Sequence, residues 1–391
     1  MIEGTGPLVE PLPFSDAEYE RRLRLLHSAM ADQGLDIFVS FTPENIYYMT
    51  GHDSPGYYFY QASVVARGEK PINVLRRIET TNTLLRSWSR RAVAYQDFED
   101  PIAATLALLD DLGVASRRVG VEADSYFATP RQWRNLIEGI RARGGEVVDA
   151  KLVEPLRVVK SEEELAHIRQ GARIVETALR ATIAASREGL TENDVAAEMW
   201  RALVCAGGEY AGLPPFIVSG PRSSLCHATW GGRRLEKGDV LAYELPGVVK
   251  RYIAPIFRCG TVGPPPADVA RLNEACVGAL EAAIAAIRPG AISGEVHAAS
   301  RGHFVKAGFG AEHGHRTGYS VGINYPPDWG EGHIMSLSHG DERELRAGMV
   351  FHLVPGVIVP GKYIVSCTDT VLVTETGCEL ITNFPRALFV V

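Results

Sequence analysis

The sequence predicts an α/β domain followed by an α+β domain. At 391 residues the chain is too long for one ordinary hydrophobic core. In its first part, short apolar runs alternate with segments of helical spacing, as in α/β domains. In its second part, long helical segments are followed by strand-like runs, which is typical of an α+β arrangement. We place the boundary where an extended stretch passes into a long helix, giving domains 1–156 and 157–391.

The first domain opens with the capping signature Ser15-Asp16-Ala17-Glu18, and the helix that follows is expected to stop at Gly34. A further turn or helix is expected at 42–45, with helices over 101–112 and 130–143 and strands over 36–41, 63–66, 119–122 and 146–149. The aromatic run Tyr57-Tyr58-Phe59-Tyr60 breaks this pattern, because four consecutive aromatics cannot all face one core. It is either a strand buried on both sides or a segment with an aromatic side chain at an interface or ligand.

The second domain is expected to begin with helices over 162–186 and 191–206, the second capped by Thr191 with Asp194. Two strands should follow, over 239–245 and 253–262, joined by a turn at Pro246-Gly247. Two more helices are predicted over 267–287 and 293–307, and the strands 349–354, 363–367 and 370–374 complete the domain.

Composition excludes several functional classes. The net charge is −7 and the basic residues are scattered among acidic ones, so a nucleic-acid partner is not expected. No stretch has the roughly 18 apolar residues of a membrane span and the N-terminus lacks a signal-peptide pattern, so we expect a cytoplasmic protein. The six cysteines occur singly, without a C-x-x-C pair, and are interpreted as small buried hydrophobes.

Glu244 is the first candidate for chemistry, because it is a carboxylate within an apolar strand. Burying an ionised carboxylate costs several kcal/mol unless it is paired or hydrogen-bonded, so a chain that places one there either uses it or satisfies it locally. His227 follows an irregular stretch and precedes this strand. A loop histidine held by a rigid scaffold is suited to general acid–base catalysis.

Other motifs in the sequence do not indicate a function. The sequence has no G-x-G-x-x-G after a strand, no P-loop and no G-x-S-x-G elbow, so nucleotide-binding and serine-hydrolase interpretations lack their required geometry. His313 and His315 form an H-x-H pair, but the pattern places no carboxylate beside it.

The second domain resembles the pita-bread fold of creatinase, prolidase and methionine aminopeptidase (M24-like proteins), and the resemblance extends to an α/β N-terminal domain. Metal-dependent members carry two metals on two Asp, one His and two Glu. When their motifs are laid on this chain, these positions hold Glu244, Pro255, Tyr319, Val354 and Thr368. Because a divalent metal needs several suitable ligands, the resemblance implies that the dinuclear site is lost and that no metal or other cofactor is required.

Three segments are similar to the ectoine hydrolases, a metal-free group of this family: 244–258, 316–332 with its YPPDWGE string, and the terminal 383–391. This resemblance implies hydrolytic ring opening of ectoine, a cyclic amidine bearing a carboxylate, to an N-acetylated 2,4-diaminobutyrate. Glu244 would attack the amidine carbon covalently, His227 would shuttle protons, and Tyr319 would donate a hydrogen bond to the tetrahedral intermediate or simply fill the place of the lost metal.

The candidate substrate-binding residues are mostly polar. Arg258 and Arg316 offer a planar fork for a substrate carboxylate, although either would equally suit a structural Asp. Trp329 is expected to wall the pocket, and the set is completed by Asp328, Tyr252 and His352.

Two rival functions stay open at this stage: a creatinase-like hydrolase of another small guanidine, amidine or lactam, and an inactive pita-bread module that binds peptides. By resemblance to creatinase and the ectoine enzymes, we expect a homodimer acting on a small molecule, with Tyr57–Tyr60 near the neighbouring subunit's pocket.

Overall fold

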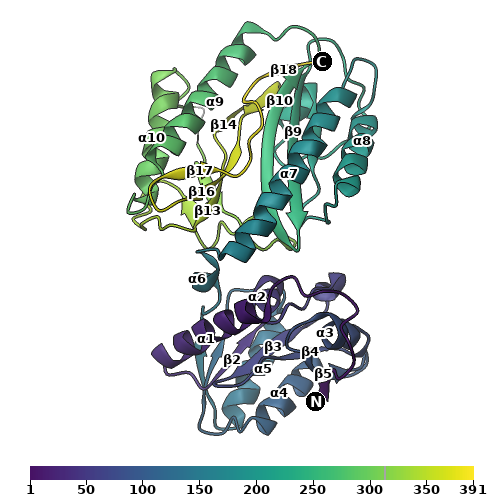
Figure 1. The fold of residues 1–391 in the computed structure, drawn as a ribbon, viewed down its shortest axis with the longest axis vertical. Helices are drawn as coiled ribbons and strands as arrows, with labels where there is room; N and C mark the ends of the chain where they lie inside the picture. Colours follow the sequence, from purple (N-terminus) through teal and green to yellow (C-terminus); the bar gives the residue numbers. More distant parts are fainter. Residues whose placement is uncertain (312–313) are drawn as a thin grey trace. The chain divides into compact units, whose positions relative to one another are not determined.

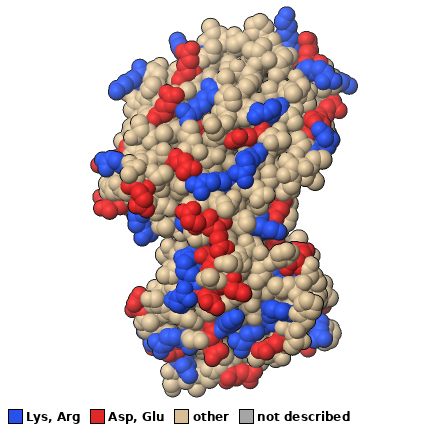
Figure 2. Space-filling view, viewed as in Figure 1, with Lys and Arg blue, Asp and Glu red and all other residues tan. Residues whose placement is uncertain are grey.

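The chain folds as two compact units, Met1–Arg157 and Val158–Val391, in a computed structural model that describes residues 1–311 and 314–391 (Figure 1). The sequence prediction placed the boundary one residue earlier. Acidic and basic side chains are intermixed over the visible face of each unit (Figure 2). Among the helices of the described ranges, none is both long and apolar enough to cross a membrane.

The first unit is built on a seven-stranded mixed sheet with strand order β1-β5-β4-β3-β2-β6-β7. The pairs β4–β5, β2–β6 and β6–β7 are parallel, and the others are antiparallel. The strands are β1 (Ile2–Glu3), β2 (Ile37–Ser40), β3 (Ala62–Ala66), β4 (Ile72–Arg76), β5 (Arg91–Tyr95), β6 (Arg118–Val121) and β7 (Glu146–Asp149). The α/β prediction is therefore confirmed, although the sequence reasoning missed β1, β4 and β5.

The helices of this unit follow their capping signals. Ser15 accepts a hydrogen bond from the backbone N–H of Glu18 at the start of the first helix, and Thr129 with Gln132 forms a full capping box. The helices are α1 (Asp16–Asp32), α2 (Pro43–Thr50), α3 (Thr80–Arg86), α4 (Pro101–Asp111), α5 (Pro130–Ala142) and α6 (Glu154–Arg157), with 3₁₀ turns η1 (Pro55–Tyr58) and η2 (Arg77–Glu79).

The aromatic run is not a strand buried on both sides. Tyr60 belongs to the core, where its hydroxyl bonds Thr105, but Tyr57 and Tyr58 lie in the 3₁₀ turn η1 and Tyr58 is 74% exposed. Pro55 and Gly56 favour this turn over an extended strand. An aromatic side chain is thus presented to solvent, and its place at an interface or ligand stays a prediction.

The second unit places its strands between two helical layers, α7 (Glu162–Ala185) with α8 (Glu192–Cys205), and α9 (Ala267–Ala286) with α10 (Ser293–Lys306) (Figure 1). One sheet has the order β18-β10-β9-β8, a second has the order β12-β11-β13-β16-β17, and β14 pairs with β15. The strands are β8 (Phe216–Ser219), β9 (Val240–Val249), β10 (Tyr252–Thr261), β11 (Gly318–Ser320), β12 (Ser336–Leu337), β13 (Val350–Leu353), β14 (Gly356–Val359), β15 (Tyr363–Ser366), β16 (Asp369–Val373), β17 (Cys378–Leu380) and β18 (Phe389–Val390), and η3 is Gly220–Ser224.

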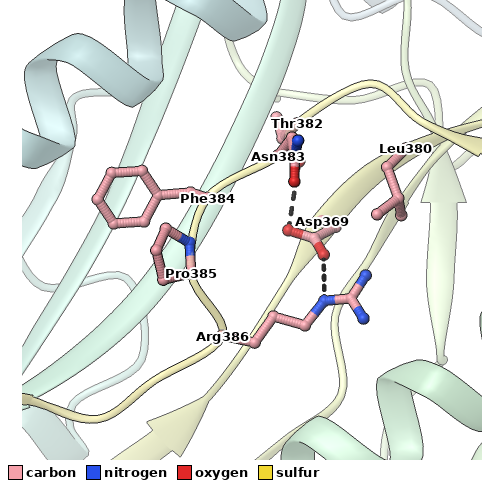
Figure 3. A pocket seen from close by; sticks show the side chains of 7 residues that line it. All are labelled: Asp369, Leu380, Thr382, Asn383, Phe384, Pro385 and Arg386. Atoms are coloured by element: carbon pink, nitrogen blue, oxygen red, sulfur yellow. Dashed lines mark hydrogen bonds and ion pairs between the residues drawn. The ribbon is translucent and has the colours of Figure 1, made fainter.

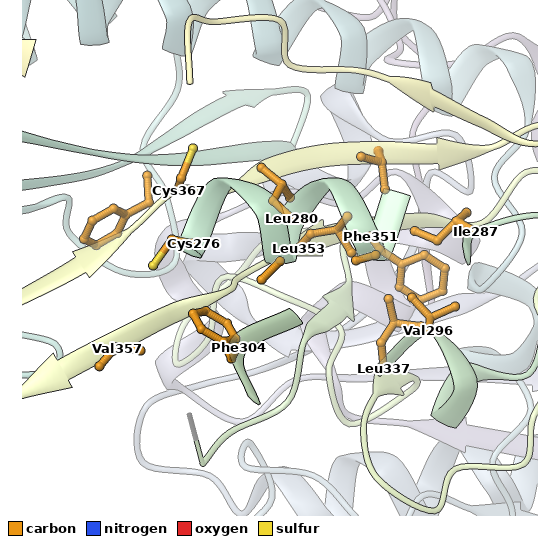
Figure 4. Close-up of a cluster of buried hydrophobic side chains, with 14 of the residues drawn as sticks. Cys276, Leu280, Ile287, Val296, Phe304, Leu337, Phe351, Leu353, Val357 and Cys367 are labelled. Atoms are coloured by element: carbon orange, nitrogen blue, oxygen red, sulfur yellow. The ribbon is translucent and has the colours of Figure 1, made fainter. Parts of the chain in front are cut away.

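The two faces of β9 pack into two different hydrophobic cores. Leu241, Tyr243 and Leu245 pack with α7 and α8, whereas Val240 and Ala242 join the core under α9 and α10. Figure 4 shows this second core, with Leu280 of α9, Phe304 of α10 and Phe351 of β13. Because side chains alternate along a strand, Glu244 lies on the same face as Ala242, turned away from α7.

The turn of the β9–β10 hairpin corrects the sequence prediction. Pro246 and Gly247 lie inside β9, and the turn is formed by Lys250 and Arg251, whose φ angles of 47° and 64° are typical of a two-residue type I′ turn. Gly247 serves a different purpose, because a Cβ there would lie 2.0 Å from the carbonyl oxygen of Gly171 in α7. Close packing of the helix on the strand requires this glycine.

Candidate functional site

Glu244 lies in the middle of β9, between two aromatic residues. Its cross-strand neighbours are Phe216 on β8 and Phe257 on β10, and paired residues on adjacent strands project to the same face. The Glu244 side chain is only partly exposed. A carboxyl group is therefore held against apolar rings on the inner face of the sheet.

This environment changes the acidity of Glu244. Burial raises the pKa of its carboxyl to about 8, and no opposite charge or hydrogen bond from the described residues offsets that effect. Near neutral pH the group is mostly protonated in the free protein. A cationic ligand beside it would favour the carboxylate, as any nearby positive charge does.

Tyr319 on β11 shares the site with Glu244. Its pKa is raised well above 10, chiefly by burial and further by the charges of Glu244 and Asp328, while Arg316 opposes the shift. The Arg316 guanidinium lies 4.3 Å from the centre of the Tyr319 ring and, among the described residues, donates a hydrogen bond to Ser336 Oγ. Arg316 is partly exposed, and a guanidinium has five N–H donors in all.

Phe216, the cross-strand neighbour of Glu244, contacts both Trp329 and His227, and we call Phe216 and Trp329 the aromatic wall of the site. The Phe216 ring lies 5.0 Å from Trp329 in a stacked arrangement and 5.4 Å from the His227 ring. Trp329 is buried and donates its indole N–H to Leu213 O, so the wall is fixed in position. His227 is exposed, with a φ of 59°, and its ring faces this wall from the neighbouring loop.

Cys226 precedes His227 and belongs to the same neighbourhood. Burial raises the pKa of its thiol, and the charge of Glu244 adds to the effect. Cys226 and Cys205 are exposed, and Cys378 is only partly buried. The interpretation of the cysteines as buried hydrophobes is therefore right for Cys259, Cys276 and Cys367 and wrong for the two exposed ones.

The loop that carries His227 is anchored by one buried carboxylate, Glu192 of α8. Glu192 is 0% exposed and accepts hydrogen bonds from the backbone N–H and hydroxyl of Ser219, the guanidinium of Arg222 and the N–H of Gly231. These partners stand on both sides of His227 in the sequence. Glu192 therefore holds the two ends of the His227 loop together.

A buried ion pair holds the segment that carries Tyr319 and Trp329. Lys160 Nζ lies 2.7 Å from Glu331 Oε2, and both side chains are 1% exposed. Glu331 also accepts hydrogen bonds from Ile323 N and Ser320 Oγ. The pair thus ties the start of the second unit to the wall of the site.

Arg258 takes the structural role that the sequence left open. It is 0% exposed, and its five N–H groups donate to Asp369 and to the carbonyls of Phe257, Thr368, Phe384 and Pro385. An arginine has five donors in all, so each of them is already used. The expectation that Arg258 binds a substrate carboxylate is corrected on this ground.

Three further candidates differ in position from what was expected. Tyr252 is a core residue that donates to Glu164 Oε1 at 2.6 Å. His352 is fully buried behind Tyr319, to which it is hydrogen-bonded. Neither Tyr252 nor His352 is therefore placed to contact substrate. Asp328 is exposed and accepts from the N–H groups of Trp329 and Gly330, which orients the wall.

The residues present do not fit a metal. Within 1–311 and 314–391, no group of three or more His, Cys, Asp or Glu side chains is placed to hold an ion. Glu244 is the single carboxylate at the family's ligand positions, and the hydroxyls of Tyr319 and Thr368 are both hydrogen-bonded to His352. His313 of the H-x-H pair lies outside the described residues.

A separate surface pocket of about 430 Å³ lies at the C-terminal segment (Figure 3). Its charged groups already pair with one another, because Asp369 bonds both Arg386 and Arg258. The pocket includes neither Glu244 nor Tyr319, so we do not place the chemistry there. Its lining residues are Asp369, Leu380, Thr382, Asn383, Phe384, Pro385 and Arg386.

Comparison with known proteins first identifies the fold class of the two units. Residues 22–159 match the Creatinase/Prolidase N-terminal domain, and the second unit has the pita-bread architecture found in prolidases and aminopeptidases. Residues 166–375 match Metallopeptidase family M24, and the chain belongs to this family.

The relatives include several hydrolases. The chain is 30% identical to "Ectoine hydrolase" of Halomonas elongata, over 97% of this chain and 98% of that one. It is 31% identical to an uncharacterized hydrolase/peptidase of Sinorhizobium fredii, over 97% and 99%. The crystal structure of dipeptidase PepE from Mycobacterium ulcerans superposes with a TM-score of 0.82 at 27% identity, over 97% and 99%. These similarities support a hydrolase.

Sequence reasoning missed three residues of the site: Phe216, Cys226 and Thr368 as a partner of His352. Phe216 belongs to a short buried strand, β8, that resembles any core strand in sequence. The signal that could have found it is the proline pair before it, which marks where a strand begins.

Proposed function

We propose that this protein is a metal-independent hydrolase of a carbon–nitrogen bond in a small cyclic amidine, with ectoine as the first candidate substrate. The observation that carries the proposal is Glu244, a partly buried carboxyl whose pKa is raised to about 8. A pKa raised by burial, with a histidine and a tyrosine nearby, is characteristic of a catalytic group.

An amidine suits this site for two reasons. Its protonated form is cationic and would favour ionisation of Glu244 on binding. Its central carbon is electrophilic, so an ionised carboxylate is able to attack it without a metal. Arg316, partly exposed and beside Tyr319, would receive a carboxylate on the far side of the substrate ring.

The reaction would proceed in two steps. Glu244 Oε forms a bond to the amidine carbon, the bond from that carbon to one ring nitrogen breaks, and His227 supplies a proton to the departing nitrogen. Water then adds to the same carbon, the bond to Glu244 breaks, and an amide and a free amine remain. Tyr319 would donate a hydrogen bond to the tetrahedral intermediate.

A metal-dependent peptidase activity, which the family name suggests, is less well supported. It would need several ligands at positions that hold Pro255, Tyr319, Val354 and Thr368. The rivals that remain are hydrolysis of another small guanidine, amidine or lactam, and peptide binding without catalysis. The homodimer with Tyr57–Tyr60 at the neighbouring pocket also stays a prediction.

The test is a substrate panel with and without chelation. Purified protein is dialysed against a strong chelator, its metal content is measured, and it is incubated with ectoine, other cyclic amidines, lactams, creatine and Xaa-Pro dipeptides under mass spectrometry. We expect metal-free protein to add one water to ectoine or another amidine at an undiminished rate. Loss of turnover on chelation with recovery on adding metal, or turnover of dipeptides alone, would overturn the proposal.

A further inference from the structure

Four residues of the second unit form a continuous hydrogen-bonded line behind the site. The N–H of Phe257 donates to Thr368 Oγ1 at 2.7 Å, and Thr368 Oγ1 lies 2.7 Å from His352 Nε2. On the other side of the ring, His352 Nδ1 lies 2.9 Å from the Tyr319 hydroxyl oxygen. All of these side chains are buried.

His352 is neutral in this line. Burial lowers its pKa to about 3, and the positive charges of Arg316 and Arg258 lower it further. A neutral imidazole carries one N–H donor and one acceptor nitrogen, so the two bonds of the ring must run in opposite senses.

The proton of Thr368 decides which sense they take. Its Oγ1 accepts from Phe257, and among the described residues the only acceptor that contacts Oγ1 is His352 Nε2. If Nε2 carried the ring proton instead, the Thr368 hydroxyl proton would be buried without an acceptor, which is costly. The other tautomer withdraws His352 as an acceptor from the Tyr319 hydroxyl, but Tyr319 is 8% exposed against 1% for Thr368 and its proton is directed to the site of Glu244, where a ligand or water accepts it. Thr368 therefore donates to Nε2, and the ring proton is on Nδ1.

This tautomer of His352 restricts the direction of the Tyr319 hydroxyl proton. Since His352 Nδ1–H donates to the Tyr319 oxygen, the hydroxyl proton of Tyr319 cannot point back at the histidine. We propose that Thr368 and His352 are positioning residues that hold the Tyr319 hydroxyl as a permanent hydrogen-bond donor, directed into the site that it shares with Glu244. This deepens the proposed function, on which its catalytic consequence rests.

Such a donor would act without any rearrangement of the protein when negative charge develops on a ligand. A hydroxyl that is free to rotate loses part of its stabilising effect, because it must first be turned toward that charge. The line also accounts for why two hydroxyl side chains and one buried neutral histidine are gathered at this point of the fold.

The tautomer of His352 can be measured without any substrate. Protein labelled with nitrogen-15 in histidine is studied by long-range nitrogen–proton correlation, and the His352 signals are assigned by their absence in His352→Asn. We expect the proton on Nδ1, the less common tautomer. A proton on Nε2 would overturn the proposal.

Variants at Thr368 add a second measurement. Thr368→Val removes the donor to Nε2 and should shift the population toward the Nε2–H tautomer, whereas Thr368→Ser should keep the wild-type tautomer. The matched control is Thr370→Val, which removes a buried hydroxyl of β16 that donates to Pro255 O, and should leave the tautomer unchanged. Equal tautomer populations in all of them would contradict the proposal, and if Thr368→Val does not fold, the wild-type and Ser measurements still decide.

Turnover of the amidine found in the panel tests the catalytic consequence. We expect Thr368→Val to lower kcat about tenfold or more with little change in KM, and Thr368→Ser to restore it, because a misdirected donor loses transition-state stabilisation. Normal kcat in a Thr368→Val protein with an altered tautomer would remove that consequence. If no amidine is turned over at all, the proposed function fails while the tautomer result stands by itself.

Discussion

Two glutamates of the second unit, one buried and one half-buried, show how the same residue type serves opposite purposes. Glu192 is 0% exposed and accepts hydrogen bonds from Ser219, Arg222 and Gly231. Glu244 is half-buried, yet burial raises its pKa to about 8 because no described residue compensates its charge. Burial alone therefore does not mark a functional carboxylate, and the missing compensation is the informative difference.

Replacing Glu244 should have the largest effect. Glu244→Gln keeps the shape but removes the attacking charge, so we expect turnover to fall on the order of a thousandfold or more. Folding should survive. The folded-state pKa lies above the ordinary value of 4.5, so the contribution of Glu244 to stability falls as the pH rises from about 4.5 to about 8 and is constant above that. At pH 9 the variant should be at least as stable as the wild type in thermal unfolding, and near-normal turnover would exclude a nucleophile.

The pH dependence of the wild type is the next largest effect. If ionised Glu244 attacks, kcat/KM should rise about tenfold per pH unit below the free-protein pKa and level off above about 8. Because a cationic substrate stabilises the carboxylate, the pKa seen in kcat should be lower than that seen in kcat/KM. Rate profiles from pH 5 to 10 measure both. A kcat/KM that is flat over this range would mean that Glu244 does not need to ionise.

Glu192→Gln is the matched variant for the other glutamate. An amide offers one acceptor oxygen in place of two, so either the Ser219 bonds or the bonds from Arg222 and Gly231 are lost, at a cost of about 1 to 3 kcal/mol. Denaturant unfolding should show this loss. Turnover should fall less than in Glu244→Gln, because the defect reaches the chemistry only through the His227 loop. Unchanged stability would mean that the loop is held in another way.

Arg316 and Arg258 also differ in how far their hydrogen-bonding groups are already used, and we expect smaller effects from replacing them than from replacing the glutamates. Arg316 is partly exposed and bonds Ser336 alone among the described residues, so Arg316→Gln should raise KM about tenfold for a substrate with a carboxylate and leave stability nearly unchanged. Arg258 has none to spare, so Arg258→Gln should lower the thermal midpoint by leaving Asp369 and several carbonyls short of partners. A substrate analogue without the carboxylate is the control, since its KM should not respond to Arg316→Gln. Equal KM effects on both ligands would exclude a carboxylate contact.

Local sequence patterns determined much of this protein. Capping signals and apolar spacing predicted α1, α7, α8, α9 and α10 to within about two residues at each end, because these signals act within one helical turn. A carboxylate inside an apolar strand singled out Glu244, and the adjacent loop singled out His227. The two-domain class also followed from length and from the order of elements. These features depend on neighbours along the chain, which a single sequence displays.

Only the tertiary structure decided which polar groups were already satisfied. Arg258 and Arg316 are alike in sequence, but one lies where four carbonyls and Asp369 converge and the other lies over the Tyr319 ring. The turn of the hairpin lies at Lys250-Arg251, whereas Pro246-Gly247 pairs with β10 inside the hairpin and Gly247 packs against α7. The partners of Thr368 and Tyr319 stand on other strands and meet only across the folded sheets. Hydrogen bonds and desolvation depend on groups that are distant in the chain, so only the folded structure could determine them.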